Sequence, residues 1–297
     1  MNAELCRLLD QQGGVVTSAQ ALTCLTRRGL ESDVKSGALQ RIWHGIYGHG
    51  ALTIALRLRG LDLATGTTVA ACLATAAAMY CFDTEQQTDL HVLNPVGRRL
   101  HSTAGLFVHR RDGAPMALMT GGVTGRPATA PAWTAIEVAR GLRRPRALAT
   151  LDAALRSGTC SRGDLQPVIE RQSGRRGIVT VRELLSLASP LAESPMESEA
   201  RLVMLDGGLP PPVLQYEVVD RSGRTWRLDF AWPESRVAAE YDGVEWHSGP
   251  EAFLRDRRRT AALLDLGWVV VPIIATDVRY RPAELVARIE RRLARAA

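Results

Sequence analysis

The sequence predicts a mixed α/β (α+β) protein, and three observations support this expectation. The 297 residues are 46% hydrophobic and 23% charged, the composition of a soluble globular protein. Amphipathic helical patterns alternate along the chain with short runs typical of β-strands. No apolar run reaches the roughly 18 residues that a membrane span needs, and the first residues lack the layout of a signal peptide. We therefore expect a cytoplasmic protein without a membrane partner.

Residues 1–50 predict a winged helix-turn-helix domain. Three short helical patterns are followed by two strand-like pieces around Gly45, which is the element order of such domains. The third pattern, GLESDVKSGALQRI, carries Glu31, Asp33 and Lys35, a surface that does not favour contact with a phosphate backbone. The pattern is compatible with direct DNA contact and with a purely protein–protein role.

Residues 51–190 predict a basic, mainly helical middle domain with two strand-like segments, DLHVLNP and AGLFVHRR. Between positions 97 and 176 the chain has 14 arginines and 5 acidic residues, a net charge of +9. This local excess predicts an anionic partner, most simply DNA, with Arg143, Arg144 and Arg146 as phosphate contacts. The alternative is a genome that favours arginine codons, since Lys35 is the only lysine.

Residues 191–297 predict a compact domain with the element order αβββαβα, separated from the middle domain by the linker PLAESP. Its helical patterns are MESEARLVMLDGG, GPEAFLRDRRRTAALLDLG and a last helix from Pro282. Its strand patterns are PPVLQYEVVD, TWRLDFAW and RVAAEYDG. The apolar run WVVVPII predicts a central buried strand. This order describes a mixed sheet flanked by helices.

Acidic side chains interrupt two of these apolar strands. A short turn joins TWRLDFAW to RVAAEYDG, which predicts an antiparallel hairpin with Asp229 nearly opposite Glu240. Strand alternation places Asp242 on the same face as Glu240. Carboxylates gathered in this way require compensation, and a hard divalent cation, Mg²⁺ or Mn²⁺, supplies it. The alternative is a network of ion pairs with basic neighbours, namely Arg227, Arg236 or the cluster Arg255–Arg259.

Three motifs of this region resemble the very-short-patch-repair-type endonuclease domain, a branch of the PD-(D/E)XK nuclease superfamily. They are SPMESEARLVMLDGGLPPPVLQYEV, LDFAWPESRVAAEYDGVEWH and RDRRRTAALLDLGW, in this order. The resemblance implies that Asp229 and Glu240 bind the metal together with Glu197 of the first helix. It also implies that Asp242 stands where most members have a lysine that polarises the attacking water. His247 falls where repair-type members carry a histidine close to the scissile phosphate.

The resemblance implies a metal-dependent DNA endonuclease, a phosphodiester hydrolase that acts in DNA repair or in defence against foreign DNA. Its catalytic residues would be Asp229, Glu240, Asp242 and His247, with His247 as general base. His247 has an alternative role as a polar residue at the hairpin rim, and Arg259 is a second candidate for the task of the missing lysine. The arginines of the following helix are either phosphate clamps or a solvated face: Arg255, Arg258 and Arg259.

The front of the chain resembles the antitoxin of type IV abortive-infection systems through GGVVTSAQAL, RIWHGIYG and GGVTGRPATAPAWTAIEVARGL. This resemblance implies a winged helix that represses its own operon and a toxin or other protein as partner. The competing function is therefore a non-catalytic, DNA-binding transcriptional regulator with a degenerate nuclease domain. Asp242 in the lysine position favours the regulator, whereas the retained Asp229–Glu240 pair favours the enzyme.

Overall fold

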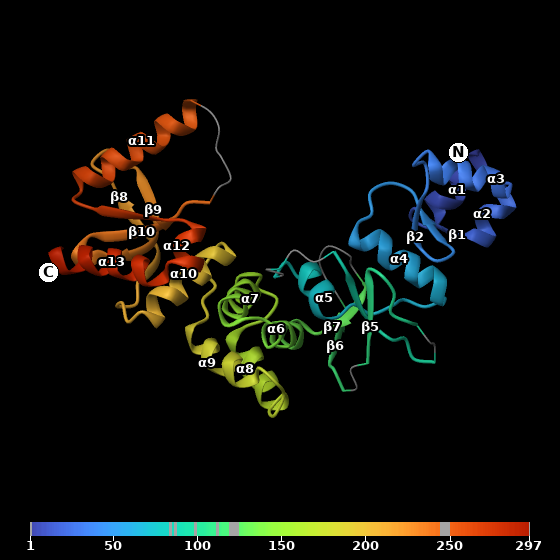
Figure 1. Cartoon of the computed structure of the whole chain (residues 1–297), viewed down its shortest axis with the longest axis horizontal. Helices are drawn as coiled ribbons and strands as arrows, with labels where there is room; N and C mark the ends of the chain where they lie inside the picture. Colours follow the sequence, from blue (N-terminus) through green and yellow to red (C-terminus); the bar gives the residue numbers. More distant parts are fainter. Residues whose placement is uncertain are drawn as a thin grey trace. The chain divides into compact units, whose positions relative to one another are not determined.

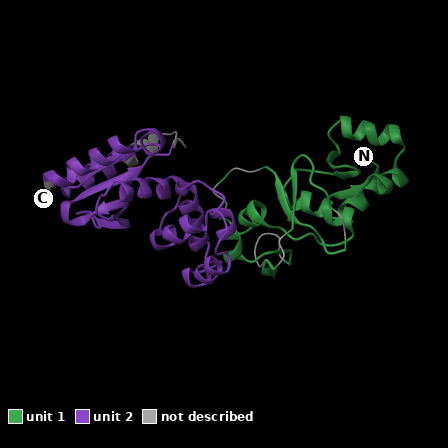
Figure 2. Ribbon diagram, turned by 60° about the horizontal axis from the view of Figure 1, so that its bottom comes forward, with its two compact units in different colours: residues 1–134 green, residues 135–297 purple. Residues whose placement is uncertain are grey.

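A computed structural model describes residues 2–82, 85, 88–97, 100–110, 113–118, 125–243 and 250–296. The chain divides into two compact units, residues 1–134 and 135–297 (Figure 2). Across the described residues, 13 α-helices accompany sheets of three, four, two and two strands. The mixed α/β class predicted from the sequence is therefore confirmed. No helix in the described ranges is both long and apolar enough to cross a lipid bilayer.

The first unit opens with a winged helix-turn-helix arrangement (Figure 1). Its strands pair antiparallel in the order β1-β3-β2, and Gly45 joins β2 to β3 with a φ of +72°. Thr17 caps α2 through a reciprocal capping box with Gln20. The elements are α1 (Ala3–Gln11), β1 (Val15–Thr17), α2 (Ser18–Cys24), α3 (Arg27–Lys35), β2 (Gln40–Trp43) and β3 (Ile46–Gly48).

Helix α3 differs at both ends from the helix that the sequence predicts. It begins at Arg27 because the Thr26 side chain accepts a hydrogen bond from an amide of the first turn and caps the helix. It ends at Lys35 because Gly37 takes a left-handed conformation, with a φ of +79°. The earlier start adds Arg27 and Arg28 to the helix, and both are exposed.

The remainder of the first unit packs two helices against short strands. The predicted strand-like segments DLHVLNP and AGLFVHRR are confirmed as a parallel pair, β4 and β5. An ion pair between Asp62 and Arg126, 2.5 Å apart, joins α4 to the segment before β7. The elements are α4 (Ile54–Thr65), α5 (Leu73–Met79), β4 (Leu90–Leu93), β5 (Leu106–His109), β6 (Met116–Leu118) and β7 (Pro127–Thr129).

The second unit contains both the helices of the predicted middle region and the predicted carboxyl-terminal sheet. Residues 135–190, which we assigned to the middle domain, thus share one compact unit with residues 191–297. The mainly helical character expected of residues 135–190 is present, with PRALATLDAALRSG lying in and just after α7 and TVRELLSLA in and just after α9. The helices up to the sheet are α6 (Pro131–Ala139), α7 (Arg144–Arg156), α8 (Arg162–Arg171), α9 (Ile178–Leu187) and α10 (Pro195–Asp206).

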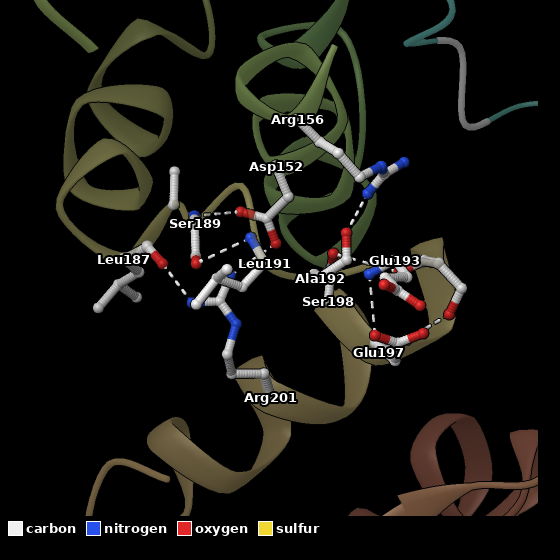
Figure 3. Close-up of polar contacts among 12 residues, drawn as sticks. Asp152, Arg156, Leu187, Ser189, Leu191, Ala192, Glu193, Glu197, Ser198 and Arg201 are labelled. Atoms are coloured by element: carbon white, nitrogen blue, oxygen red, sulfur yellow. Dashed lines mark hydrogen bonds and ion pairs between the residues drawn. The ribbon is translucent and has the colours of Figure 1, made fainter. Parts of the chain in front are cut away.

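A buried ion pair joins α7 to α10 (Figure 3). Asp152 is fully buried, and its Oδ2 accepts a hydrogen bond of 2.6 Å from Nη2 of Arg201, which is 6% exposed. The other oxygen of Asp152 accepts the Ser189 amide at 2.7 Å. Arg201 also donates to the Leu187 carbonyl at 2.5 Å. The pair therefore satisfies two charges and two backbone groups at the same place.

Further side-chain contacts hold the connection between α9 and α10, the segment that the sequence marks as a linker. Arg156 of α7 donates to the Ala192 carbonyl, and the Glu193 amide donates to Glu197 of α10 (Figure 3). Arg162 of α8 donates to the carbonyls of Leu185 and Ala188. Side chains of three helices thus hold this connection, so it does not behave as a free linker.

The carboxyl-terminal sheet has the strand order β11-β10-β9-β8, with β10 and β11 parallel and the other pairs antiparallel. Helix α11 covers one face, and α10, α12 and α13 cover the other (Figure 1). The elements are β8 (Val213–Val219), β9 (Thr225–Trp232), a 3₁₀ turn (Pro233–Ser235), β10 (Val237–Tyr241), α11 (Pro250–Asp265), β11 (Val269–Ile273), α12 (Ala275–Tyr280) and α13 (Pro282–Ala296).

Two features of this sheet correct the sequence-based expectation. The run WVVVPII forms an edge strand, β11, and not a central one, with Val269 39% exposed. Pro272 lies within it and has no amide to donate, which suits an edge. An additional short helix, α12, follows β11, so the observed order is αβββαβαα.

We predict that Arg201→Met lowers the free energy of unfolding by about 3–5 kcal/mol, because the buried Asp152 carboxyl loses its counter-ion. Burial already raises the pKa of Asp152, so it must either remain ionised and unpaired or take up a proton. Urea denaturation followed by circular dichroism measures this loss. The control is Arg144→Met, which removes an ion pair with Asp206 whose side chains are 39% and 47% exposed, and should cost about 1 kcal/mol or less. Equal losses in the two variants would contradict the assignment of Asp152–Arg201 as a structural pair.

Candidate functional site

The candidate site lies where strands β8 and β9 change faces. Leu214 and Phe230 pack on the α10/α13 side of the sheet, whereas Tyr216 and Leu228 pack on the α11 side. These residues are direct partners in the β8–β9 register, so the change occurs between them. At this level Gln215 has a φ of +51°, a conformation that costs energy for a residue with a side chain.

Asp229 of β9 faces this irregular position. Its Oδ2 accepts a hydrogen bond of 3.0 Å from the Tyr241 amide. The β9–β10 register pairs Phe230 with Ala239, and its continuation sets Asp229 beside Glu240. Burial raises the pKa of Asp229; the Tyr241 amide and nearby arginines oppose this rise, and the Glu197 carboxylate adds to it.

Glu240 of β10 is neutralised within the chain by Arg259 of α11. The guanidinium donates Nη1 to Glu240 Oε2 at 2.5 Å and Nη2 to Oε1, a bidentate pair. Arg259 also donates to the Arg227 carbonyl of β9 at 3.1 Å. Burial raises the pKa of Glu240, Arg259 opposes this rise, and the carboxylates of Asp229 and Asp242 add to it. Of the two compensations that the sequence leaves open, this geometry is the ion pair.

Glu197 brings a third carboxylate from α10. It is 8% exposed, and its Oε2 accepts the Glu193 amide at 2.9 Å and Nε2 of Gln215 at 3.1 Å. The Oε1 atom of Gln215 is buried and has no hydrogen-bond partner among the described residues. Glu197 lies close enough to Asp229 for its charge to raise the pKa of Asp229, and Gln215 is hydrogen-bonded to Glu197 beside them.

The described side chains do not fit a divalent cation shared by Asp229 and Glu240. Both oxygens of Glu240 are taken by Arg259. Within the ranges that the structure describes, no group of three or more His, Cys, Asp or Glu is placed to hold a metal ion. The carboxylate cluster is thus arranged around an internal cation, the Arg259 guanidinium.

The other residues predicted for this site are dispersed or lie outside the described parts of the chain. Asp242 is exposed, and its amide donates to the Ile273 carbonyl at 2.8 Å. Arg258 is exposed on α11. His247 and the side chain of Arg255 lie outside the described residues.

The arginines of the basic segment have a structural use that the sequence does not reveal. Arg144 pairs with Asp206, and Arg146 pairs with Glu199 at 3.0 Å, whereas Arg143 is exposed. At least seven of the fourteen arginines between positions 97 and 176 bind carboxylates or carbonyls of this chain: Arg126, Arg140, Arg144, Arg146, Arg156, Arg162 and Arg175. Carboxylates of the chain therefore neutralise part of this positive charge, and carbonyls hold other guanidinium groups in place.

Sequence reasoning missed two sets of residues. Gln215 is the only uncharged polar residue in the apolar strand VLQYEVV, and its place opposite Asp229 could have drawn attention to it. Arg27 and Arg28 are the second set, because the helix that the sequence predicts begins at Gly29 and the observed helix begins at Arg27. Thr26 is a good helix cap and could have indicated the earlier start.

By its fold, this protein belongs to the class in which a winged helix-turn-helix domain precedes a mixed α/β region. The sheet near the carboxyl end of that region carries the carboxylates described above. Residues 69–187 match the family model of the AbiEi antitoxin C-terminal domain. This match includes residues 121–142, on which part of the antitoxin resemblance rests. The matches give no support to the endonuclease resemblance.

Two relatives from Mycobacterium tuberculosis align with almost the whole chain. They are named Uncharacterized protein MT2308 (strain CDC 1551 / Oshkosh) and Uncharacterized protein Rv2248 (strain H37Rv). Each is 54% identical over 272 residues, which cover 92% of this chain and 98% of the relative. The chain belongs to the family of these mycobacterial proteins.

We predict that Asp229→Asn raises the stability of the protein at neutral pH. The raised pKa means that the folded state gives up this proton less readily than the unfolded state, so ionisation costs stability as pH rises above the ordinary aspartate range. The asparagine oxygen still accepts the Tyr241 amide. Denaturant midpoints should be higher than wild type at neutral pH, and the gain should shrink as the solution is acidified.

The control is Asp220→Asn, which should have the opposite sign. Hydrogen bonds from Ser222, Arg224 and Trp226 lower the pKa of Asp220 to about 2. Its ionised form therefore contributes stability above the unfolded pKa, and this contribution is lost as pH falls toward 2. A neutral-pH loss in both variants would contradict the account of Asp229.

Proposed function

We propose that the chain is a DNA-binding protein of antitoxin type. The observation that carries this proposal is the match of residues 69–187 to an antitoxin domain, in a chain whose first 50 residues form a winged helix-turn-helix. A regulator of this kind needs a surface for DNA and a protein partner. The partner that the antitoxin match favours is a toxin.

The DNA surface that we propose is the amino end of α3. In helix-turn-helix proteins the second helix of the motif enters the major groove with its first residues. Here that helix is α3, and it starts with Arg27 and Arg28, which are both exposed. Arg41 on strand β2 is also exposed, so the wing adds a further positive charge. Arginine suits this place because its guanidinium binds phosphates and guanine edges.

The acidic residues of α3 do not remove this charge. The helix has three basic residues, Arg27, Arg28 and Lys35, against Glu31 and Asp33, a net charge of +1. The two arginines stand in the first turn, ahead of both acids. The free backbone amides at the amino end of a helix also attract anions. The amides and the two arginines of α3 therefore attract the DNA phosphates at the same place.

We predict that Arg27→Ala/Arg28→Ala weakens binding to a duplex that spans the region upstream of the gene. Fluorescence anisotropy over a range of salt concentrations measures both the affinity and its salt slope. The slope should fall by about 1–2 units, since each phosphate contact contributes about 0.9 to it. The matched control is Arg291→Ala/Arg292→Ala, two exposed arginines of α13. An equal loss in the control pair would assign the effect to overall charge.

A second candidate function is phosphodiester hydrolysis of nucleic acid with Mg²⁺ or Mn²⁺. The convergence of Glu197, Gln215 and Asp229 at a strained strand position favours it, because strain and buried carboxylates gather at active sites. The bidentate pair between Arg259 and Glu240 opposes it, since Glu240 is then not available to a cation. Hydrolysis at this site therefore requires that Arg259 first leaves Glu240.

We expect the purified full chain to leave supercoiled plasmid intact in the presence of either metal ion, as the regulator function requires. Nicking or linearisation by wild type that is lost in Asp229→Asn would establish the second function. Cleavage that persists in Asp229→Asn would point to a contaminating nuclease. Gel electrophoresis of the plasmid over time reads out all three results.

A further inference from the structure

The second unit contains an arginine-lined cavity that neither proposed function uses. Its volume is about 270 Å³, and it lies between the amino end of α7, helix α10 and the carboxyl end of α12. Its polar lining consists of five residues: Arg143, Arg146, Glu199, Arg279 and Tyr280. Ligand pockets span roughly 300–1,000 Å³, so this cavity lies just below that range and has room only for a small ligand.

The charge of the cavity is positive and ordered. Three arginines face one acid, which gives a net charge of +2 for the lining. Glu199, 5% exposed, accepts Nη1 of Arg146 at 3.0 Å and both Nε and Nη2 of Arg279, at 3.1 and 3.0 Å. A single carboxylate thus holds two guanidinium groups in place. Their orientation is set before any ligand arrives, which reduces the entropic cost of binding.

Glu199 remains ionised in this role. Burial alone would raise its pKa, but the hydrogen bonds and charges of Arg279 and Arg146 outweigh burial and lower the pKa below its usual range. The two guanidinium groups therefore stay fixed across the neutral range. The remaining positive charge of the lining is left for an anionic ligand.

Arg143 supplies that remaining charge. It is exposed, and its side chain has no ion pair or hydrogen bond within the described chain. It is also the N-cap residue of α7, a helix of 13 residues, and makes no side-chain capping bond there. The helix dipole adds to the positive potential at this end. Arg143 and the helix end together favour an anion with several oxygen atoms, such as a phosphate group.

The rest of the lining is apolar and aromatic. Pro145, Val203 and Val278 line it, and Tyr280 stands at the rim with 79% of its surface exposed. An exposed tyrosine ring beside an anion site offers a platform on which a flat ring can stack. A ligand that uses both features carries a phosphate and an aromatic base.

We propose that this cavity binds a phosphate monoester of the nucleotide class, with the phosphate at Arg143 and the base on Tyr280. The same chemistry occurs in a free mononucleotide and at the 5′-phosphorylated end of a nucleic-acid strand. Arg279 and Arg146 contribute the charge around the phosphate, and Glu199 acts as the residue that positions them. The proposal is independent of DNA binding by α3 and of hydrolysis at Asp229.

Isothermal titration calorimetry of the full chain at about 0.15 M salt, where exposed charges are screened, tests this proposal. The probes are adenosine 5′-monophosphate, adenosine and inorganic phosphate. We expect the monophosphate to bind at least about tenfold more tightly than either of the other two. Binding of adenosine as tight as that of the monophosphate would overturn the phosphate site, and equal binding of inorganic phosphate would overturn the base platform.

Two variants assign the binding to this cavity. Arg143→Ala should weaken binding of the monophosphate by about ten- to a hundredfold, as the loss of a charge-assisted hydrogen bond predicts, and Tyr280→Ala should weaken the monophosphate but not inorganic phosphate. Both side chains are exposed and make no hydrogen bond in the described residues, so both variants should keep the wild-type melting temperature. Arg291→Ala is the control on α13. Unchanged binding in Arg143→Ala would overturn the proposal.

A pair of short oligonucleotides, one with a 5′-phosphate and one with a 5′-hydroxyl, separates the two sources of the ligand. Tighter binding of the phosphorylated strand than of the mononucleotide assigns the cavity to strand ends. Equal or weaker binding of that strand assigns it to free nucleotides. Both results support the cavity as a site for a nucleotide phosphate.

Discussion

The ion pair between Asp152 and Arg201 is the constraint on which the second unit depends. It closes α7 onto α10, and each of its two side chains makes one further hydrogen bond to the backbone at the connection before α10. Removing either partner would leave a buried charge, which is far more costly than never having had the pair. The ion pair thereby fixes the direction of α10 against α7. Because Glu197 and Glu199 stand on the same helix, this pair also positions the carboxylate cluster and the arginine-lined cavity.

Arginine fulfils a common task throughout this chain, which is to neutralise carboxylates and to satisfy carbonyls at helix ends. Arg126, Arg201 and Arg259 each pair with an acid of a distant element. A guanidinium has five donors in a fixed plane and can bind an acid and a carbonyl together. A basic composition is therefore a weak indicator of nucleic-acid binding here, because the compensation becomes visible only in three dimensions. The functional proposals therefore rest on particular exposed arginines, Arg27, Arg28 and Arg143, and not on the total charge.

Sequence patterns predicted most elements, and they failed where tertiary context decides. Helix caps and the turn between β9 and β10 depend on residues close in the sequence. The sequence therefore predicted helix α2 and the position of Asp229 beside Glu240 in the β9–β10 hairpin. The run WVVVPII looked like a central strand because its apolar character does not distinguish an edge covered by helices from a centre, although Pro272 could have indicated the edge. The Arg259–Glu240 pair joins residues 19 positions apart, so it was one of several alternatives. Gln215 and the cavity at α7 depend on backbone geometry and folding that no spacing shows.

The winged helix and the carboxylate-bearing sheet make different demands on nucleic acid, since the first requires a duplex and the second a phosphate beside buried acids. Hydrogen–deuterium exchange of the full chain with and without the upstream duplex distinguishes them most directly, because it reports protection along the whole backbone. We expect slower exchange in residues 27–35 and 40–48, with unchanged exchange in residues 213–241. Protection confined to residues 197–241, or none in α3 at saturating duplex, would contradict the claim that this protein binds DNA through its winged helix.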